Sequence, residues 1–406
     1  MLFRSRFREN RGGEYYAHGI QNQTDVRGWL EVGDWLAVQA QPKFISNHHA
    51  LGIGPTNHSD NVYMREYSIK ATYANVALEA GRISQWWGQG YHGSLLVTDH
   101  VLPMQMIRLG SDESFRLPGM FSSLGEWKVN TFLARLEQNR DFAYANVFGL
   151  RVSYLPTDWL ELGGTRLTQF GGQGRDQSFP GTVIDTFFSS PNQSGGKNVN
   201  EQSMLDFRAR VPRVPYLVPF ASGMQLYGEL GSEDKWSQVP IPSRAAFLTG
   251  VYIPQLFTND TQDLRIEYGD TDYTRRKTGL KGVWYNNSTY VSGMRYRGFP
   301  LGDNIGTDAV DFFVRTTRFL TKEIQLGTNL NLQERAKGQP VHERKREFGP
   351  DLTWWLSARA QVQVGYTYQY LKNPGQITAL TPYIETFASG VTAQNHFLWT
   401  SLMIEF

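Results

Sequence analysis

The chain has no cysteine, and none of its apolar runs approaches about 18 residues. The first absence excludes disulfide bonds and metal sites built from thiolates. The second excludes a membrane-spanning helix, but not a β-barrel, in which only every second residue of a strand is apolar. The formal net charge is only +2, which argues against a nucleic-acid partner.

Two kinds of segment are also missing. The opening residues, MLFRSRFREN, contain neither the apolar core nor the small-residue cleavage site of a secretory signal. No Pro- or Ser-rich linker divides the 406 residues. We therefore expect a single domain over residues 1–406, and an exported protein whose precursor was trimmed or of which this chain is a fragment.

The chain does contain many short runs in which apolar and polar residues alternate, as in 323–332 and 361–370. Many have the roughly 9 to 11 residues of a tilted membrane strand, and tight connections alternate with long ones in the carboxy-terminal half. These features favour an all-β fold, a transmembrane antiparallel β-barrel, over a soluble sandwich. Strands are predicted at 25–32, 35–44, 62–72, 76–83, 127–137, 145–155, 159–168, 203–211, 223–230, 245–253, 263–269, 280–285, 290–297, 309–319, 323–332, 348–356, 361–370 and 396–406.

The last stretch, HFLWTSLMIEF, ends at Phe406 with apolar residues at alternate positions. It resembles the closing strand of bacterial outer-membrane β-barrels, and we expect it to pair with the first strand so that no edge remains. If it runs toward the periplasm, the tight turns face the periplasm and the long connections face outward. The predicted turns are 156–158, 286–289, 321–322 and 357–360, and the predicted outer loops are 171–200, 232–244, 298–307, 335–347 and 371–393.

Arginines occur inside many of these strands, and an arginine on the lipid face costs roughly 2 to 4 kcal/mol at mid-depth. We expect most of them to point into a polar lumen and to pair with acidic residues such as Glu229 or Glu267. Such a lattice either stiffens the barrel wall or lines an ion-selective conduit.

The most distinctive stretch is GRISQWWGQGYHGSLLVTD, residues 81–99. Its glycines permit close backbone approach, while Trp86, Trp87 and Tyr91 offer flat aromatic faces with a polar edge that suit sugar rings. The alternative is that the tryptophans pack the lumen or belong to an aromatic girdle at the membrane interface. Because the segment 84–126 is too long for one hairpin, we expect it to fold partly into the lumen.

The motif GRxxxWWGxGxxGSLL, the segment LGEWKVNTFLARLEQNRD, the segment GLRVSYLPTDWLELGGTRLTQFGGQGR and the PSR at 242–244 resemble the capsule assembly Wzi family. The resemblance implies a barrel of about 18 strands in the bacterial outer membrane, occluded by its own loops. It also implies a non-enzymatic, monomeric lectin that binds capsular polysaccharide at the cell surface. The helical segment that plugs the periplasmic mouth in this family is missing from the chain.

The predicted polysaccharide site combines the aromatic segment with two basic outer loops, 271–279 and 335–347. Clustered cations suit the uronic acids of many capsular polymers, so affinity is expected to fall with salt. Alternatively, the same cations hold lipopolysaccharide phosphates and other lipid headgroups at the outer leaflet. The candidate binding residues are Trp86, Trp87, Tyr91, His92, Trp236, Arg275, Arg276, Lys277, Arg344, Lys345 and Arg346.

Other functions remain open from the sequence. An open lumen would make the chain a diffusion porin for sugars or ions. His92, Ser94 and Asp99 contain the residue types of a hydrolase, although nothing supplies an oxyanion hole.

A metal site is a further alternative. His48, His49, His58 and Asp60 lie in one outer loop, but their irregular spacing favours a solvated loop. No cofactor fingerprint is present, so we expect no cofactor.

Overall fold

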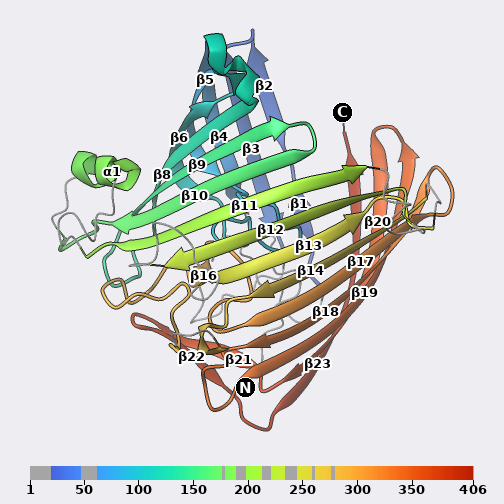
Figure 1. Ribbon diagram of the computed structural model, residues 1–406. Coiled ribbons are helices and arrows are strands. Elements are labelled where there is room, and N and C mark those ends of the chain that lie inside the picture. Colours follow the sequence, from blue (N-terminus) through green and yellow to red (C-terminus); the bar gives the residue numbers. More distant parts are fainter. Residues whose placement is uncertain are drawn as a thin grey trace.

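The structure is a computed structural model that describes residues 20–46, 62–175, 179–188, 198–212, 221–233, 245–257, 261–275 and 279–405 (Figure 1). Long antiparallel strands dominate it. The strands of the main sheet are β1 (Gln23–Asp25), β2 (Gly28–Val32), β3 (Leu36–Ile45), β4 (Val62–Tyr73), β5 (Val76–Ile83), β6 (Met104–Ser111), β7 (Phe115–Arg116), β8 (Glu126–Arg135), β9 (Asn146–Thr157), β10 (Leu160–Phe170), β11 (Asn200–Pro212), β12 (Gly223–Glu233), β13 (Ala246–Ile253), β14 (Gln262–Asp270), β17 (Val310–Phe319), β18 (Ile324–Arg335), β19 (Glu343–Ser357), β20 (Ala360–Lys372) and β23 (Thr392–Ile404).

Smaller elements decorate the sheet. They are the hairpins β15 (Arg295–Tyr296) with β16 (Phe299–Pro300) and β21 (Gly375–Leu380) with β22 (Tyr383–Phe387), the helix α1 (Phe179–Phe188) and the 3-10 turns η1 (Gly119–Leu124) and η5 (Tyr273–Arg275). No helix in the described ranges is long and apolar enough to cross a membrane.

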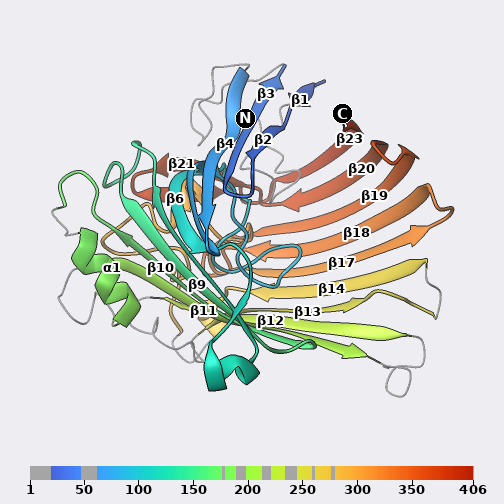
Figure 2. The ribbon, with the colours of Figure 1, turned by 90° about the horizontal axis from the view of Figure 1, so that it is seen from above.

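The nineteen strands of the main sheet are all antiparallel to their neighbours and follow the chain order. β1 and β2 pair with successive parts of β3, and β6 and β7 both pair with β8. The nineteen strands therefore fill only seventeen places side by side in the sheet. The sheet curves around the segments between β5 and β6 and between β14 and β17 (Figure 2). This confirms the predicted all-β antiparallel architecture. The pairing of β23 with the first strand stays a prediction, since β20 is its partner among the described residues.

The two faces of the sheet differ in polarity. On β18, Leu326, Leu330 and Leu332 are exposed on the outer face, whereas Asn331 and Gln333 are buried on the inner face. An apolar exterior and a polar interior are what a barrel in lipid requires. The predicted alternation of an apolar and a polar face is confirmed on this strand.

The connections also differ between the two ends of the strands. Residues 158–159, 320–323 and 358–359 form short turns at one end, called here the turn end, where β23 also finishes. The helix α1 and the hairpin β21–β22 lie at the opposite end, called the loop end (Figure 1). The predicted tight turns at 321–322 and 357–360 are confirmed, and the turn predicted at 156–158 lies at 158–159.

The predicted strands at 280–285 and 290–297 are wrong, and so is the turn at 286–289 between them. Residues 271–309 instead form one long connection between β14 and β17, with only the short β15–β16 hairpin inside it. Trp284, Tyr285 and Tyr290 in this connection are fully buried. Their apolar spacing reflects packing inside the barrel, which sequence periodicity does not distinguish from contact with lipid.

The lumen is therefore filled by protein. Leu95 and Leu96, from the segment between β5 and β6, belong to the same fully buried cluster as Trp284 and Tyr285 from the β14–β17 connection. We call residues 84–103 the lumen segment. Its position confirms the expectation that part of 84–126 folds into the barrel, and the core of the protein lies inside the sheet.

Ion pairs line the inner wall. Arg151 makes two hydrogen bonds to the Asp206 carboxylate, at 2.7 and 3.0 Å, and Arg315 makes two to Asp351, at 2.8 and 3.0 Å. These pairs satisfy charges that would be costly beside lipid. They match the prediction that arginines within the strands point into the lumen and pair with acidic residues.

Candidate functional site

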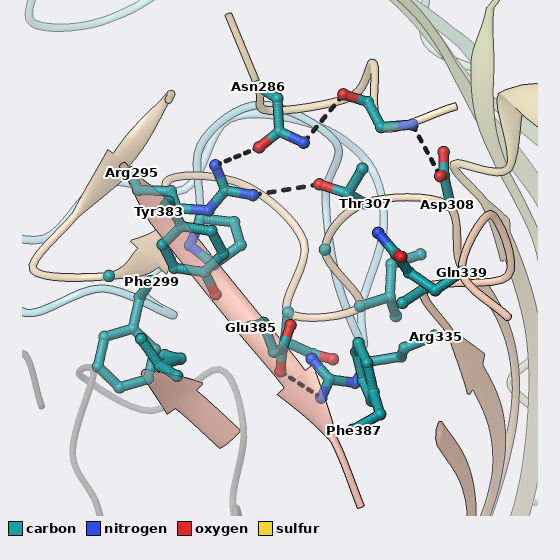
Figure 3. Close-up of a pocket in the computed structure, with 18 of the residues that line it drawn as sticks. Asn286, Arg295, Phe299, Thr307, Asp308, Arg335, Gln339, Tyr383, Glu385 and Phe387 are labelled. Carbon is teal, nitrogen blue, oxygen red and sulfur yellow. Dashed lines mark hydrogen bonds and ion pairs between the residues drawn. The ribbon is translucent and has the colours of Figure 1, made fainter. Parts of the chain in front are cut away.

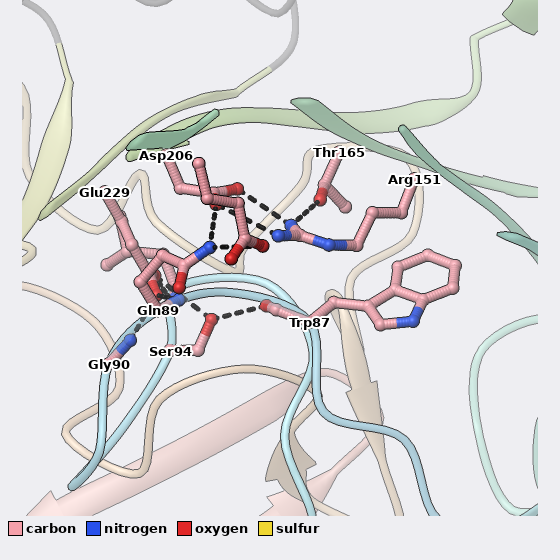
Figure 4. Close-up of polar contacts among 10 residues, drawn as sticks. Trp87, Gln89, Gly90, Ser94, Arg151, Thr165, Asp206 and Glu229 are labelled. Carbon is pink, nitrogen blue, oxygen red and sulfur yellow. Dashed lines mark hydrogen bonds and ion pairs between the residues drawn. The ribbon is translucent and has the colours of Figure 1, made fainter. Parts of the chain in front are cut away.

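The Glu229 carboxylate on β12 binds residues 89–90 and 94–95 of the lumen segment (Figure 4). It accepts hydrogen bonds from the backbone N–H of Gln89 at 2.7 Å, of Gly90 at 2.9 Å and of Leu95 at 2.8 Å. The Ser94 hydroxyl donates a fourth at 3.0 Å. Four donors compensate for the burial of this carboxylate away from water.

Glu267 on β14 holds the residues in between. Its carboxylate accepts hydrogen bonds from the backbone N–H of Tyr91 at 2.7 Å, of His92 at 3.0 Å and of Gly93 at 3.2 Å. The Tyr227 hydroxyl donates another at 2.9 Å. The two glutamates thus fix residues 89–95 to the barrel wall. The predicted arginine partners of these glutamates are wrong, because backbone amides of the lumen segment occupy the carboxylate oxygens.

Glycine is required where the lumen segment meets these acidic groups. Gly88 has a φ of 137°, and a Cβ there would lie 2.1 Å from the Ser94 hydroxyl oxygen. At Gly93 a Cβ would lie 2.4 Å from a carboxylate oxygen of Asp303. Any side chain would force the backbone away from the carboxylates. The glycines of this motif therefore serve the docking of the segment.

The aromatic residues of the segment lie in different surroundings. Trp87 is only 4% exposed and packs against Phe132, with ring centroids 4.8 Å apart, whereas Trp86 is partly exposed. Tyr91 is exposed, and the Arg265 guanidinium lies 4.3 Å above its ring and 4.1 Å above that of Tyr252, close to the turn end of β13. The burial of Trp87 favours a packing role, and sugar binding by these residues stays a prediction.

His92 and Ser94 face different partners. The His92 ring stacks on Phe313 at 4.1 Å, and its Nε2 lies 3.6 Å from the Asp311 carboxylate. Ser94 is fully buried, and the Trp87 carbonyl oxygen at 2.6 Å and the Glu229 carboxylate at 3.0 Å share its single hydroxyl proton. A buried hydroxyl turned away from the histidine is no accessible nucleophile.

The predicted metal ligands His48, His49, His58 and Asp60 lie outside the described residues. Within the described ranges, no group of three or more His, Asp or Glu side chains is arranged to hold a metal ion.

The basic cluster at 344–346 is in a strand, which corrects the predicted loop 335–347. β18 extends to Arg335 and β19 begins at Glu343, so only 336–342 form the loop. Arg344 and Arg346 are exposed on the outer face, and Arg344 pairs with Glu334 at 3.0 Å. Lys345 is 4% exposed and points inward, because successive strand residues face opposite sides.

Three of the remaining predicted site residues cannot be placed. Trp236, Arg276 and Lys277 lie outside the described residues. Arg275 ends the 3-10 turn η5 in the β14–β17 connection.

A pocket that was not predicted lies at the loop end (Figure 3). Four parts of the chain form it: His100 of the lumen segment, the β14–β17 connection, the end of β18 with the β18–β19 loop, and the hairpin β21–β22. Its cavity volume is about 190 Å³, which is smaller than the roughly 300–1,000 Å³ of typical drug-sized ligand sites. We call it the loop-end pocket.

Two buried arginines shape this pocket. Arg335 donates to Glu343 at 2.7 Å and to Glu385 at 3.0 Å, which attaches β22 to the barrel wall. Arg295 donates to the side chains of Asn286 at 2.8 Å and Thr307 at 3.1 Å. The contacts fix both guanidinium groups, so the pocket is preformed.

Two further groups complete the lining. The Arg295 guanidinium lies 4.0 Å from the ring centre of Tyr383 on the hairpin. Burial raises the pKa of the Asp308 carboxyl to about 6, although the Gly282 N–H donates a hydrogen bond to it at 2.8 Å. The pocket was not predicted because residues 280–285 and 290–297 were expected to form strands. The many Gly and Asn residues within 282–306 indicate a loop instead.

Comparisons with known proteins agree with this architecture. The family model described as capsule assembly protein Wzi matches residues 3–380. The solved structure of Wzi, an outer membrane protein involved in group 1 capsule assembly in Escherichia coli and a carbohydrate-binding β-barrel, superimposes with a TM-score of 0.69. It is 20% identical, and the match covers 87% of this chain and 75% of that one.

Two more distant or partial matches were found. An uncharacterized 55.8 kDa protein in the cps region of Klebsiella pneumoniae is 29% identical over 255 residues, which is 62% of this chain. The matched part spans about half, 48%, of that relative. OccAB2 of Acinetobacter baumannii covers 94% of this chain and 92% of its own length, with a TM-score of 0.49 and 13% identity, too low to support an argument.

The family match extends over most of the chain, and the antiparallel strands, polar interior and occluded lumen fit a barrel in lipid. The chain belongs to the capsule assembly protein Wzi family and is an outer-membrane β-barrel.

Proposed function

We propose that this chain is a non-enzymatic outer-membrane protein that binds capsular polysaccharide at the cell surface during capsule assembly. The observation that carries this proposal is a barrel closed by its own segments, with a pocket at the loop end. A closed barrel cannot pass solutes, but it can present a rigid binding surface. The family match supports the same function.

A porin function is the weaker candidate. Leu95, Leu96 and Trp284 are fully buried within the barrel, and the two glutamates attach the lumen segment to the wall. Open porins instead keep a water-filled channel. One chain forms both the occlusion and the pocket, so the proposed protein acts as a monomer.

The proposal requires the loop end to face outward. We expect an epitope inserted into residues 336–342 to be labelled by antibody on intact cells, because outer-membrane barrels have their longer loops outside. An epitope at 321–322 should be labelled only after the cells are permeabilised. Labelling of 321–322 alone on intact cells would reverse the orientation and the proposed location of the site.

Polysaccharide binding is tested with the detergent-solubilised barrel and purified capsular polysaccharide from the strain that encodes it. We expect saturable binding by the wild type, and loss of capsule from cells in which the gene is deleted. No binding by a folded, heat-resistant barrel would contradict the proposed function.

The outward-facing Arg344 and Arg346 are proposed to contact lipopolysaccharide or lipid headgroups rather than the polymer, since they lie near the loop end of a lipid-facing surface. In the same assay, a variant with both arginines changed to Gln should bind the polysaccharide as the wild type does. A large loss at low salt would instead assign them to the polymer.

A further inference from the structure

The loop-end pocket combines aromatic and polar walls. Tyr383 and Phe299 lie on one side, and Asp308, Gln339 and Arg335 lie across from them (Figure 3). Apolar rings beside a few fixed polar groups are typical of sites for small organic ligands. Rings also suit the C–H faces of sugars, whose hydroxyl groups point outward around the ring edge.

The charges of the lining are balanced. The charged side chains are Arg295, Arg335, Asp308 and Glu385, two of each sign. Arg335 is already paired with Glu385 and with Glu343 outside the pocket lining. The pocket therefore has no excess of positive charge that would attract a polyanion.

Three buried polar atoms in lining residues have no hydrogen-bond partner among the described residues. They are the Nε donor of Arg295, the Nδ2 donor of Asn304 and the Oδ1 acceptor of Asp308. Unpaired buried groups are costly, and a ligand that both donates and accepts can satisfy each kind. A hydroxyl group does both, whereas a carboxylate only accepts and would be repelled by Asp308 and Glu385.

The aromatic wall is held in place before any ligand binds. The Arg295 guanidinium lies against the Tyr383 ring at 4.0 Å, and the Arg335–Glu385 contact holds the same hairpin strand. Phe299 is buried and meets His100 edge to face at 5.1 Å. Rings fixed in advance lose little conformational entropy when a ligand packs on them.

We propose that the loop-end pocket is the saccharide-binding site of this chain, and that it binds uncharged sugar units of the polysaccharide through hydroxyl hydrogen bonds and aromatic packing. This proposal rests on the proposed function and specifies its location and ligand class. The cavity of about 190 Å³ admits only a short segment of a polymer. Binding should therefore depend only weakly on salt, because screening acts on net charges.

The test uses two forms of one probe. Purified capsular polysaccharide is compared with the same polymer after carbodiimide activation and borohydride reduction, which convert its carboxyl groups to hydroxymethyl groups. We expect the solubilised wild-type barrel to bind both forms with Kd values within about threefold, over 50 to 300 mM salt.

Two variants locate the site. Tyr383→Ala removes an aromatic wall, and Gln339→Trp fills the pocket from an exposed position whose side chain makes no hydrogen bond within the described residues. Each should weaken binding of both probe forms at least tenfold. Because Tyr383→Ala could loosen the hairpin, Gln339→Trp keeps the test valid. The matched control is Tyr73→Ala, an exposed tyrosine at the turn end that should bind like the wild type.

The outcomes separate the two proposals. If the wild type binds neither form, the proposed function itself fails. If it binds the native polymer and both pocket variants bind equally well, the function stands and the location in this pocket is wrong. If the wild type binds only the native polymer, or loses it steeply with salt, the ligand is an acidic unit and the inference about uncharged sugars is overturned.

Discussion

Replacing Glu229 and Glu267 together by alanine should convert the closed barrel into an ion-conducting one. Each carboxylate accepts hydrogen bonds from four donors, of which three are backbone N–H groups of the lumen segment. Without the carboxylates these donors are unpaired as long as the segment stays docked, at a cost of about 1–3 kcal/mol each. Part of this cost is offset, because the variant no longer buries two carboxylates.

The undocked state avoids the cost, because its N–H groups bind water. The population of barrels with an open lumen should therefore rise. In planar bilayers we expect stable conductance steps for the double variant and none for the wild type. The single variants should lie between them, since each leaves the other glutamate in place.

The control removes another buried acidic group, which pairs within the barrel wall. Glu79 on β5 pairs with Arg108 at 2.5 Å within the wall, so Glu79→Ala should stay closed. If the double variant folds to a heat-resistant barrel and still does not conduct, packing around Leu95 and Trp284 is sufficient for docking and the glutamates are dispensable.

An arginine introduced at either of two neighbouring positions of β20 should have very different effects on the free energy of unfolding. Val364 is exposed on the outer face in the central third of β20, and Gln363 next to it faces the lumen. Val364→Arg places a charge against lipid and should lower the free energy of unfolding by about 2–4 kcal/mol. Gln363→Arg should change it by less than about 1 kcal/mol, because the inner wall is polar.

Urea unfolding of the barrel refolded into lipid vesicles measures both variants, with tryptophan fluorescence as the signal. Equal destabilisation by the two substitutions would contradict the assignment of faces on β20. Stronger destabilisation by Gln363→Arg would mean that the register of the strand is reversed.

The sequence alone was sufficient to identify the class of fold. The alternation in 323–332 and 361–370 has the period of a strand, and the apolar positions of both runs are on the outer face. The glycine-rich motif at 81–99 also indicated an inserted segment and the family. These features are local, and a local pattern depends mainly on the backbone period and on which face meets water or lipid.

Long-range contacts were decided only by the tertiary structure. Glu229 and the Gln89 amide that it binds are 140 residues apart, and no periodicity links them. The spacing of Trp284, Tyr285 and Tyr290 resembled a strand because apolar residues packed inside the barrel follow the same spacing as residues facing lipid. The pocket was missed for the same reason: three connections and the lumen segment meet at the loop end, and their meeting depends on how the whole sheet curves.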